Sequence, residues 1–273
     1  MLELYYLQEA DSICSNRVLM TFLEKGIEDW IPHKLVLLNR DQFKPEYLKL
    51  NPKAQVPTLV HDGRVIRESS IICDYIDDIK SDPALKPSDP ADIAHLREWI
   101  KDSDESGYQA TASINFVTKF RLEIPLEEME KRWEKVPDID RLHRQQSCVY
   151  EGLDSLYVMR AIGAWERIFH KMENTLYDGR PWIMGSQFTL IETANAPFIK
   201  VLEMLQLLHL WLDGRPNVQR WWESVSRRSS YKSLEEYPGQ GEDDEAPHAK
   251  AGAAVENKIR DLLISYRKTI SQI

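Results

Sequence analysis

The order of hydrophobic patterns along the chain is the feature that most restricts its fold. In residues 1–80, short apolar runs typical of β-strands alternate with segments of helical spacing, whereas residues 93–234 show helical patterns and no convincing strand. A small mixed sheet with helices packed on it accounts for the first segment, and a separate set of helices accounts for the second. The sequence therefore predicts an α/β domain followed by an all-α domain.

The elements of the first segment are predicted in the order βαβαββα. Residues 2–6 alternate as a half-buried strand does, and a helix follows from Asp11 or Ser12 to Gly26. Residues 33–38 predict a second strand, and residues 44–50 predict a short helix. A hairpin is predicted over 56–66, because the Asp62-Gly63 dipeptide suits the twist of two paired strands. The last helix begins at Glu68-Ser69, and the residues expected to be buried on it are Ile72, Tyr75, Ile76 and Ile79.

Residues 81–92 are rich in Pro, Asp and Ser, and we interpret them as a linker. In the helical domain, 93–234, we expect one long helix over 95–120 in spite of Gly107, an irregular interruption over 136–154 and a helix over 156–176. Thr189 and Glu192 form a predicted capping box, and residues 215–234 predict the last helix of this domain. The tail, 235–273, combines an acidic stretch without periodicity up to residue 254 with a helical pattern over 255–270. Packing on the helical domain is the favoured role for that last helix.

Bulk composition excludes several classes of protein. A net charge of −9 and a pI near 5.4 argue against a protein that binds the DNA or RNA backbone, which needs a basic face. Cys14, Cys73 and Cys148 are too few and too scattered for a disulfide scaffold or a structural zinc site. The N-terminus lacks the features of a secretory signal, and no apolar run is long enough to span a bilayer. We therefore expect a cytoplasmic protein with no metal, no nucleic-acid partner and no membrane span.

Three strings carry a resemblance to a known family. NPKAQVPTLVHDG (51–63) and RESSIICDYI (67–76) resemble the thioredoxin-like N-terminal domain of glutathione S-transferases. WIMGSQFTLIETANAPFI (182–199) is similar to a hallmark of the helical domain of the same family. The resemblance covers residues 2–234 and implies the glutathione S-transferase fold, an enzyme that uses glutathione as co-substrate, and a homodimer.

In that family the proline at the position of Pro57 is cis, and the preceding residue, here Val56, turns its backbone N–H and C=O toward the cysteinyl part of glutathione. The ligand thus completes hydrogen bonds left open at a strand end. The alternative is an ordinary trans proline, which is far commoner in X–Pro bonds generally. Gln42, Lys44 and Gln55 occupy places where the family contacts the glycine carboxylate or the peptide backbone, although a solvated lysine is the alternative at Lys44.

The pair Glu68-Ser69 stands at the start of a predicted helix, where backbone N–H groups carry partial positive charge. The resemblance implies that these groups and the Ser69 hydroxyl bind the γ-glutamyl carboxylate of glutathione, and that the Glu68 carboxylate binds its ammonium. Plain helix capping is the alternative for both residues.

The heptapeptide SICSNRV (12–18) is the candidate for activating the thiol of glutathione. An ordinary cysteine thiol has a pKa of about 8.5, so little of it is thiolate at neutral pH. A hydroxyl hydrogen bond and a helix N-terminus both favour the thiolate. The string resembles the SxCSxRV stretch of zeta-class transferases and tetrachlorohydroquinone dehalogenases, in which the residues at Ser12 and Cys14 carry the chemistry. A gapless alignment with bacterial β-aryl etherases points to Ser15 instead. The candidate catalytic residues therefore rank Ser12, then Cys14, then Ser15, and a small buried thiol is the structural alternative for Cys14.

Strings at 50–78, 85–92, 97–106 and 133–146 look like the bacterial β-aryl etherase branch of the family. That resemblance implies that glutathione thiolate displaces a phenol from a lignin-derived β-aryl ether ketone. Two alternatives stay open: a general transferase or dehalogenase of chlorinated hydroquinones, and a non-catalytic interaction module with the same fold. Tyr108, Asn115 and Phe116 are expected to line the site for the small aromatic electrophile.

Overall fold

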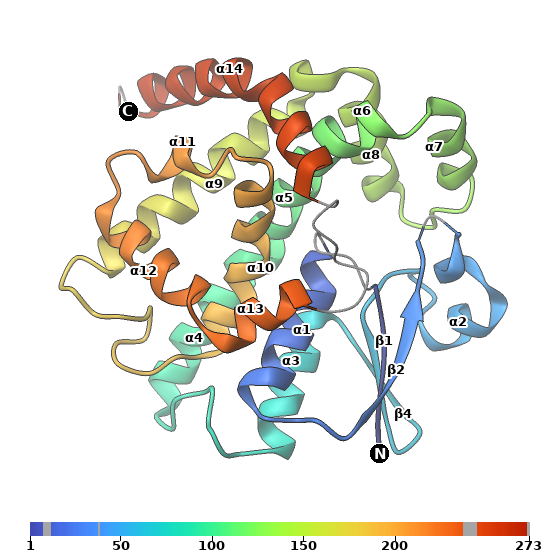
Figure 1. Ribbon diagram of the computed structural model, residues 1–273, viewed down its shortest axis with the longest axis vertical. Coiled ribbons are helices and arrows are strands. Elements are labelled where there is room, and N and C mark those ends of the chain that lie inside the picture. The colour runs from blue at the N-terminus through green and yellow to red at the C-terminus, as the bar shows by residue number, and fades with distance from the viewer. Residues whose placement is uncertain (8–11, 38, 237–244, 272–273) are drawn as a thin grey trace. The chain divides into compact units, whose positions relative to one another are not determined.

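The computed structural model describes residues 1–7, 12–37, 39–236 and 245–271, whose contacts form two compact units (Figure 1). Of the described residues, 1–101, 180–197 and 222–236 form the first unit, and 102–179, 198–221 and 245–271 form the second. Each unit is therefore assembled from segments far apart in the sequence. The linear domain boundaries expected at residues 80, 92 and 234 stay predictions.

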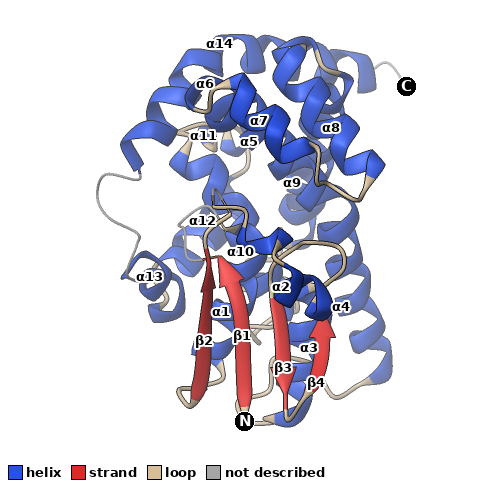
Figure 2. Cartoon of the chain, turned by 90° about the vertical axis from the view of Figure 1, so that its right-hand side faces the viewer, coloured by secondary structure: helices blue, strands red, loops and turns tan. Residues whose placement is uncertain are grey.

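The first unit contains a four-stranded sheet in the order β2-β1-β3-β4, drawn in red in Figure 2. Strand β1 pairs parallel with β2 and antiparallel with β3, and β3 pairs antiparallel with β4. This arrangement confirms the predicted βαβαββα order. In chain order the elements are β1 (Leu2–Leu7), α1 (Ile13–Glu24), β2 (Trp30–Leu35), η1 (Asp41–Phe43), α2 (Pro45–Leu50), β3 (Thr58–His61), β4 (Arg64–Arg67), α3 (Ser69–Ile79) and α4 (Pro90–Asp102).

The second strand begins earlier than residues 33–38, so the prediction for its bounds was wrong. The indole of Trp30 packs edge-on against Tyr6 and Phe22, with ring centroids 5.8 and 5.2 Å apart, and this contact anchors the start of β2. Because β2 is an edge strand, most of its side chains are only partly buried and give no apolar alternation. An edge position also tolerates Pro32, which has no N–H to donate.

The hairpin between β3 and β4 was predicted correctly. Asp62 and Gly63 have φ of 48° and 77°, the pair of positive values that a tight type I′ turn requires. Gly63 adopts this conformation without steric cost.

Helices α1 and α3 pack against each other and supply much of the core of the first unit. Val18 and Phe22 of α1 and Ile72 and Ile76 of α3 are at most 1% exposed. Ile79 was expected in this core but is 41% exposed, because it is the last residue of α3 and lies past the buried part of the helix. Asp11, one of the two residues proposed to cap α1, lies outside the described residues.

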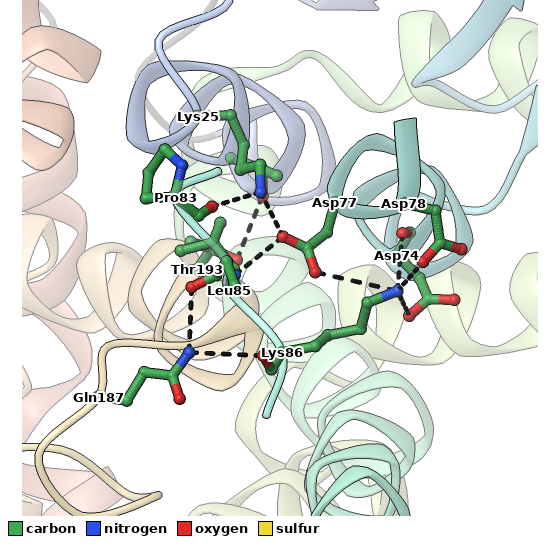
Figure 3. Close-up of polar contacts among 11 residues, drawn as sticks. Lys25, Asp74, Asp77, Asp78, Pro83, Leu85, Lys86, Gln187 and Thr193 are labelled. Carbon is green, nitrogen blue, oxygen red and sulfur yellow. Dashed lines mark hydrogen bonds and ion pairs between the residues drawn. The ribbon is translucent and has the colours of Figure 1, made fainter. Parts of the chain in front are cut away.

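A buried ion pair joins the C-terminal ends of these two helices (Figure 3). The ammonium of Lys25 is fully buried and lies 2.5 Å from Oδ1 of Asp77, and it also donates to the carbonyl of Pro83. The same Asp77 oxygen accepts the backbone N–H of Leu85 at 2.8 Å. The Lys–Asp pair thus fixes the segment after α3, which was interpreted from sequence as a linker.

The predicted capping box is present at the start of α10 (Leu190–Met204). The Glu192 carboxylate accepts the backbone N–H of Thr189 at 2.8 Å and that of Ile183 at 2.9 Å. The Thr189 hydroxyl accepts the N–H of Ile191 rather than the expected N–H of Glu192. Burial raises the pKa of the Glu192 carboxyl against these hydrogen bonds, which favour the ionised form.

The long helix expected over 95–120 is continuous but contains two π-helical turns, η2 (Ser103–Gly107) and η3 (Phe116–Phe120). Gly107 lies within it because a Cβ there would come 3.1 Å from the Phe198 ring. The remaining elements are α5 (Tyr108–Asn115), α6 (Arg121–Glu123), α7 (Leu126–Trp133), α8 (Ile139–Tyr150), η4 (Gly152–Asp154), α9 (Leu156–Thr175), α11 (His209–Leu212), α12 (Pro216–Ser226), α13 (Ser229–Glu236) and α14 (Glu245–Ile270).

Three expectations for the helical region were wrong. The segment 136–154 contains a regular helix, α8, capped by the Asp138 side chain, which accepts the N–H of Arg141 at 2.8 Å. Its buried face includes the polar residues Arg144 and Gln145, so apolar residues alone do not outline that face. The segment 215–234 forms two helices rather than one, and α14 begins at residue 245 rather than 255. Residues 237–244 of the acidic stretch lie outside the described residues.

Helix α14 packs on the second unit, against α9 and η3, as its apolar spacing predicted. Its Arg267 and the nearby Arg215 both donate to the buried Glu166 of α9, at 3.0 and 2.5 Å. Although burial opposes ionisation, these two guanidinium groups hold the pKa of Glu166 below its usual range. Gly163 faces the Tyr266 ring so closely that a Cβ would approach it to 2.8 Å.

Among the described residues, every helix is too short or too polar to span a bilayer. In the same part of the chain, His, Cys, Asp and Glu side chains form no group of three or more that could hold a metal ion.

The buried ion pair predicts a large stability effect. In Lys25→Met the Asp77 carboxylate would stay buried with only the more distant Lys86 ammonium, 3.9 Å from its Oδ2, so we expect the free energy of unfolding to fall by about 3–5 kcal/mol. Urea unfolding followed by circular dichroism measures this change. The control is Lys131→Met, which breaks an exposed ion pair with Glu127 and should cost at most about 1 kcal/mol. Equal effects of the two substitutions would show that the buried pair stabilises the fold no more than a surface pair does.

Candidate functional site

The register of the sheet brings three loops to one edge. Tyr5, near the end of β1, pairs with Thr58 at the start of β3, and Thr58 pairs with Arg67 at the end of β4. The start of α1 follows β1, the Val56-Pro57 dipeptide precedes β3, and the Glu68-Ser69 dipeptide follows β4. All three predicted motifs of the first unit therefore lie at this edge.

The two serines at the start of α1 differ in what their hydroxyls do. Ser15 is fully buried, and its Oγ accepts the backbone N–H of Leu7 at 3.1 Å, which ties the helix to the end of β1. Ser12 is the N-cap residue of α1, yet its side chain makes no capping bond. Ser12 is 6% exposed, and Cys14 is half-buried and not in a disulfide. The Ser12 hydroxyl thus does not cap the helix, whereas that of Ser15 has a structural role.

The Val56–Pro57 peptide bond is cis, as predicted. Pairing between β1 and β3 stops at Thr58, so Val56 lies two residues beyond the ladder. No hydrogen bond joins the Val56 backbone to another described residue. Its N–H and C=O can therefore pair with an extended ligand placed along the end of β3.

A hydrogen-bonded group behind this loop holds it in place. The Tyr47 hydroxyl donates to the carbonyl of Gln55 at 2.5 Å and contacts Oγ1 of Thr58 at 2.9 Å. The Asn51 amide donates to the same carbonyl and the same hydroxyl, at 2.9 and 3.1 Å. Burial is the main cause that raises the pKa of Tyr47 to about 12, so the hydroxyl stays a donor at neutral pH.

The start of α3 combines a buried hydroxyl with a buried cation. Ser69 is 8% exposed, and its Oγ accepts a hydrogen bond of 3.0 Å from the Arg17 guanidinium, which is 1% exposed. Because Arg17 occupies an acceptor site on this oxygen, the Ser69 proton is directed to another acceptor. Glu68 has φ of 67°, an uncommon value outside glycine that is typical of functional sites. The helix terminus, the hydroxyl and the guanidinium together favour an anion.

Among the remaining predicted ligand residues, Glu68 and Lys44 are exposed and Gln42 is buried. The Glu68 carboxylate pairs with Lys53 at 2.5 Å, and the exposed Lys44 pairs with Asp41 at 2.8 Å. The hydrogen bond to Asp41 raises the pKa of Lys44, and the pKa of Asp41 is lowered by the same contact. Gln42 is buried on η1, and its Oε1 lacks a partner among the described residues.

The three residues predicted to contact a second substrate belong to the second unit. Tyr108 begins α5, and Asn115 ends it two turns later. Phe116 follows in η3 and stacks on Phe120, with ring centroids 4.5 Å apart. Asn115 and Phe116 are buried, and Oδ1 of Asn115 has no hydrogen-bond partner in the described part of the chain.

The sequence motifs did not identify a role for Arg17, Tyr47, Asn51 or Thr58. These residues act through other site residues and carry no motif of their own. Thr58 follows Pro57 directly, so its position beside the loop was the one available signal.

Comparison with known proteins places these features in context. Residues 11–79 match the family described as "Glutathione S-transferase, N-terminal domain", and residues 153–229 match "Glutathione S-transferase, C-terminal domain". Together the two segments span more than half of the chain.

The chain is similar to Protein LigF of Sphingobium sp. strain SYK-6, with 38% identity over 96 residues, which are 33% of this chain and 36% of that protein. It is 26% identical to the tetrachloro-p-hydroquinone reductive dehalogenase of Sphingobium chlorophenolicum over 238 residues, which are 83% of this chain and 93% of that protein. The crystal structure of β-etherase LigF shares the fold, with a TM-score of 0.72, 23% identity, and coverage of 86% of this chain and 98% of that one. A glutathione transferase of Burkholderia graminis with two glutathione molecules bound per subunit has a TM-score of 0.66 and 22% identity, covering 88% of this chain and 89% of that one.

The hydrogen bonds of Tyr47 predict a pH-dependent effect of Tyr47→Phe. At neutral pH we expect the variant to lose about 1–3 kcal/mol of stability, because a buried carbonyl loses a donor. The folded pKa of about 12 lies above the ordinary value of 10, so this contribution is complete below pH 10 and is lost as the pH rises toward 12.

Wild-type stability should therefore fall more steeply than that of Tyr47→Phe between pH 10 and 12, by up to about 1.4 kcal/mol per pH unit. Urea unfolding at a series of pH values tests this. Tyr177→Phe is the matched control at a ring that is 77% exposed, and it should leave the stability curve unchanged. Parallel curves for wild type and Tyr47→Phe would contradict the assignment.

Proposed function

Because the chain belongs to the glutathione S-transferase superfamily and is an enzyme of that family, we propose that it cleaves lignin-derived β-aryl ether ketones with glutathione. The observation that carries glutathione binding is the open backbone of Val56 beside the Ser69–Arg17 pair at one sheet edge. A tripeptide with a carboxylate at one end matches both features.

In the proposed complex the Val56 backbone pairs with the cysteinyl residue of glutathione. The γ-glutamyl carboxylate lies at the start of α3, where Ser69 donates its proton and Arg17 adds positive charge. Glu68 exchanges its exposed Lys53 partner for the ligand ammonium, because a surface ion pair stabilises little. Gln42, Lys44 and Gln55 are proposed to bind the glycine carboxylate or the peptide backbone.

The thiol then lies near the start of α1. We assign its activation to Ser12, whose hydroxyl makes no capping bond, and a donor at this place favours the thiolate. The thiolate attacks the carbon that carries the aryloxy group, a C–S bond forms, and the C–O bond breaks with release of a phenolate that takes up a proton. The neighbouring ketone makes this displacement feasible.

The β-etherase specificity is supported by the similarity to LigF and by the string at residues 50–78. Tyr108, Asn115 and Phe116 are proposed to bind the aromatic substrate. A cytoplasmic homodimer is the form we propose for the protein. The deciding experiment measures phenol release from a β-aryl ether ketone with and without glutathione.

Dehalogenation of a chlorinated hydroquinone is the second candidate, favoured by the 26% identity to the reductive dehalogenase and by the half-buried Cys14. A mixed-disulfide route would need the Cys14 thiol, whereas direct displacement of a phenol does not. Cys14→Ser should therefore keep β-ether cleavage and abolish any dehalogenation. A non-catalytic module is disfavoured, because folding gives no reason for the unused hydroxyl of Ser12.

Glutathione binding should depend on Ser69. Ser69→Ala removes one charge-assisted hydrogen bond, so we expect the affinity for glutathione to fall by about 1.5–3 kcal/mol, with little change in the pKa of the bound thiol. Isothermal titration calorimetry measures the affinity. Thr193→Ala serves as a control, since Thr193 is buried in the same unit away from this sheet edge. An unchanged affinity in Ser69→Ala would overturn the placement of the γ-glutamyl group.

Thiol activation should depend on Ser12 and not on Ser15. In Ser12→Ala the thiolate loses a hydrogen bond, so the pKa of bound glutathione should rise by about 1–2 units. The rate near neutral pH should fall and recover at high pH, where the thiol ionises unaided. Thiolate absorbance against pH gives this value directly.

Ser15→Ala is the matched control, because its hydroxyl is occupied by Leu7. It should lower stability by about 0.5–1.5 kcal/mol and leave the thiol pKa unchanged. If the pKa of bound glutathione rises in Ser15→Ala and not in Ser12→Ala, Ser15 activates the thiol. An unshifted pKa in both variants would assign activation to the helix N-terminus alone.

A further inference from the structure

Two arginines on one face of α8 lack carboxylate partners. Arg144 is 3% exposed, and no hydrogen bond or ion pair joins its guanidinium to any described residue. Arg141, one turn earlier, is half-buried, and its Nε also lacks a partner among the described residues. Residues three apart on a helix are neighbours, so the two cations lie on the same face.

Burying two guanidinium groups without a carboxylate partner lowers the stability of the fold unless an anion binds to them. A guanidinium cannot lose its proton at physiological pH, and a buried charge is normally paired because desolvation costs several kcal/mol, on the order of the stability of a domain. Burial lowers the pKa of Arg141, and Arg144 acts in the same direction, while Tyr108 and Asp138 oppose them. Asp138 forms no ion pair with either arginine, since its side chain accepts the N–H of Arg141 as the helix cap.

Apart from the Asp138 carboxylate near Arg141, the groups described below around the two cations are aromatic and polar. The Arg144 guanidinium lies over the Tyr108 ring, 5.6 Å from its centroid. Gln145, next to Arg144 in the chain, has a neutral amide, and its Oε1 accepts the Trp133 indole N–H at 3.1 Å. Cys148 lies one turn further along α8, and burial raises the pKa of its thiol, which keeps it neutral. These residues all belong to the second unit.

The helix that carries the Tyr108 ring, α5, belongs to the same unit as the two arginines. Tyr108 and Asn115 lie two turns apart on α5, a helix bounded by the π-helical turns η2 and η3, and π turns are frequent at functional sites. The unpartnered buried Oδ1 of Asn115 and the stacked ring of Phe116 stand at the second of these turns.

We propose that Arg144 and Arg141, with the Tyr108 ring, form a binding site for the carboxylate of an aromatic ligand. A planar guanidinium binds a carboxylate through two parallel hydrogen bonds, and the adjacent ring stacks on an aromatic acid. Resting on the proposed function, this assignment means that the second substrate is an aryl ether ketone bearing a carboxylate, such as one that releases vanillate. The arginines are then specificity-determining residues of that substrate.

The first experiment measures binding without glutathione, so that it does not depend on the reaction. Veratrate is the acidic probe and acetoveratrone its neutral counterpart, and each is titrated into the full chain by calorimetry. In Arg144→Met we expect the affinity for veratrate to fall about 10- to 100-fold and that for acetoveratrone to stay unchanged. Equal affinity for veratrate in wild type and variant, or equal losses for both probes, would overturn the proposal. Inorganic phosphate is titrated in parallel, and tighter binding of phosphate than of veratrate would also overturn it.

Thermal unfolding separates a binding role from a structural one. An arginine kept for binding should leave the melting temperature of the unliganded Arg144→Met variant equal to or above that of wild type, because an uncompensated buried charge is removed. A marked fall would identify Arg144 as structural and contradict the proposal. Arg144→Lys keeps the charge without the planar fork, and veratrate binding between those of wild type and Arg144→Met supports bidentate recognition.

Arg160→Met is the matched control, since the exposed Arg160 guanidinium lies over the Tyr157 ring at 5.7 Å in a similar pair. It should change neither veratrate affinity nor melting temperature. In kinetics, Arg144→Met should lower kcat/KM for a vanillate-releasing ether about 10- to 100-fold and spare a guaiacol-releasing ether. If neither ether is cleaved while veratrate binding still depends on Arg144, the carboxylate site stands and the proposed β-etherase function fails.

Discussion

Two buried cross-links between α1 and α3 determine the geometry of the first unit. Arg17 donates to Ser69 at one end of the helix pair, and Lys25 pairs with Asp77 at the other. The cross-links are eight residues apart on both helices, a rise of about 12 Å along each axis. Equal spacing on the two helices requires that they run in the same direction, so both N-termini lie at the same end of the pair, within about one turn of each other.

That constraint brings two helix ends together at the glutathione site proposed above. Each N-terminus carries partial positive charge, and burial in a protein strengthens such fields. Because the cis peptide at Val56–Pro57 is placed by the sheet and by Tyr47, three groups of donors are fixed without any contribution from a ligand. Such preorganisation spares the entropy that ordering would cost on binding.

The sequence anticipated the features that depend on local chemistry. The turn at Asp62-Gly63, the cap at Glu192 and the element order follow from residues near one another in the chain, and each was found. The start of β2 and the whole of α8 were missed, since β2 is an edge strand with few buried side chains and α8 is rich in charge and buries the polar residues Arg144 and Gln145. Whether a polar side chain is buried depends on contacts distant in sequence, and this explains why the burial of Tyr47, Arg17 and Arg144 emerged only from the structure.

The close packing of Gly163 against Tyr266 has a consequence for the history of this chain. Glycine fits at 163 beneath the C-terminal helix α14, since a Cβ would come within 2.8 Å of the Tyr266 ring and the ring would have to shift. In a relative that ends before such a helix, alanine at this place would be preferred, because it stabilises a helix by about 1 kcal/mol over glycine. The residue at this one position of α9 should therefore reveal, in a bare alignment, which homologues acquired the extension.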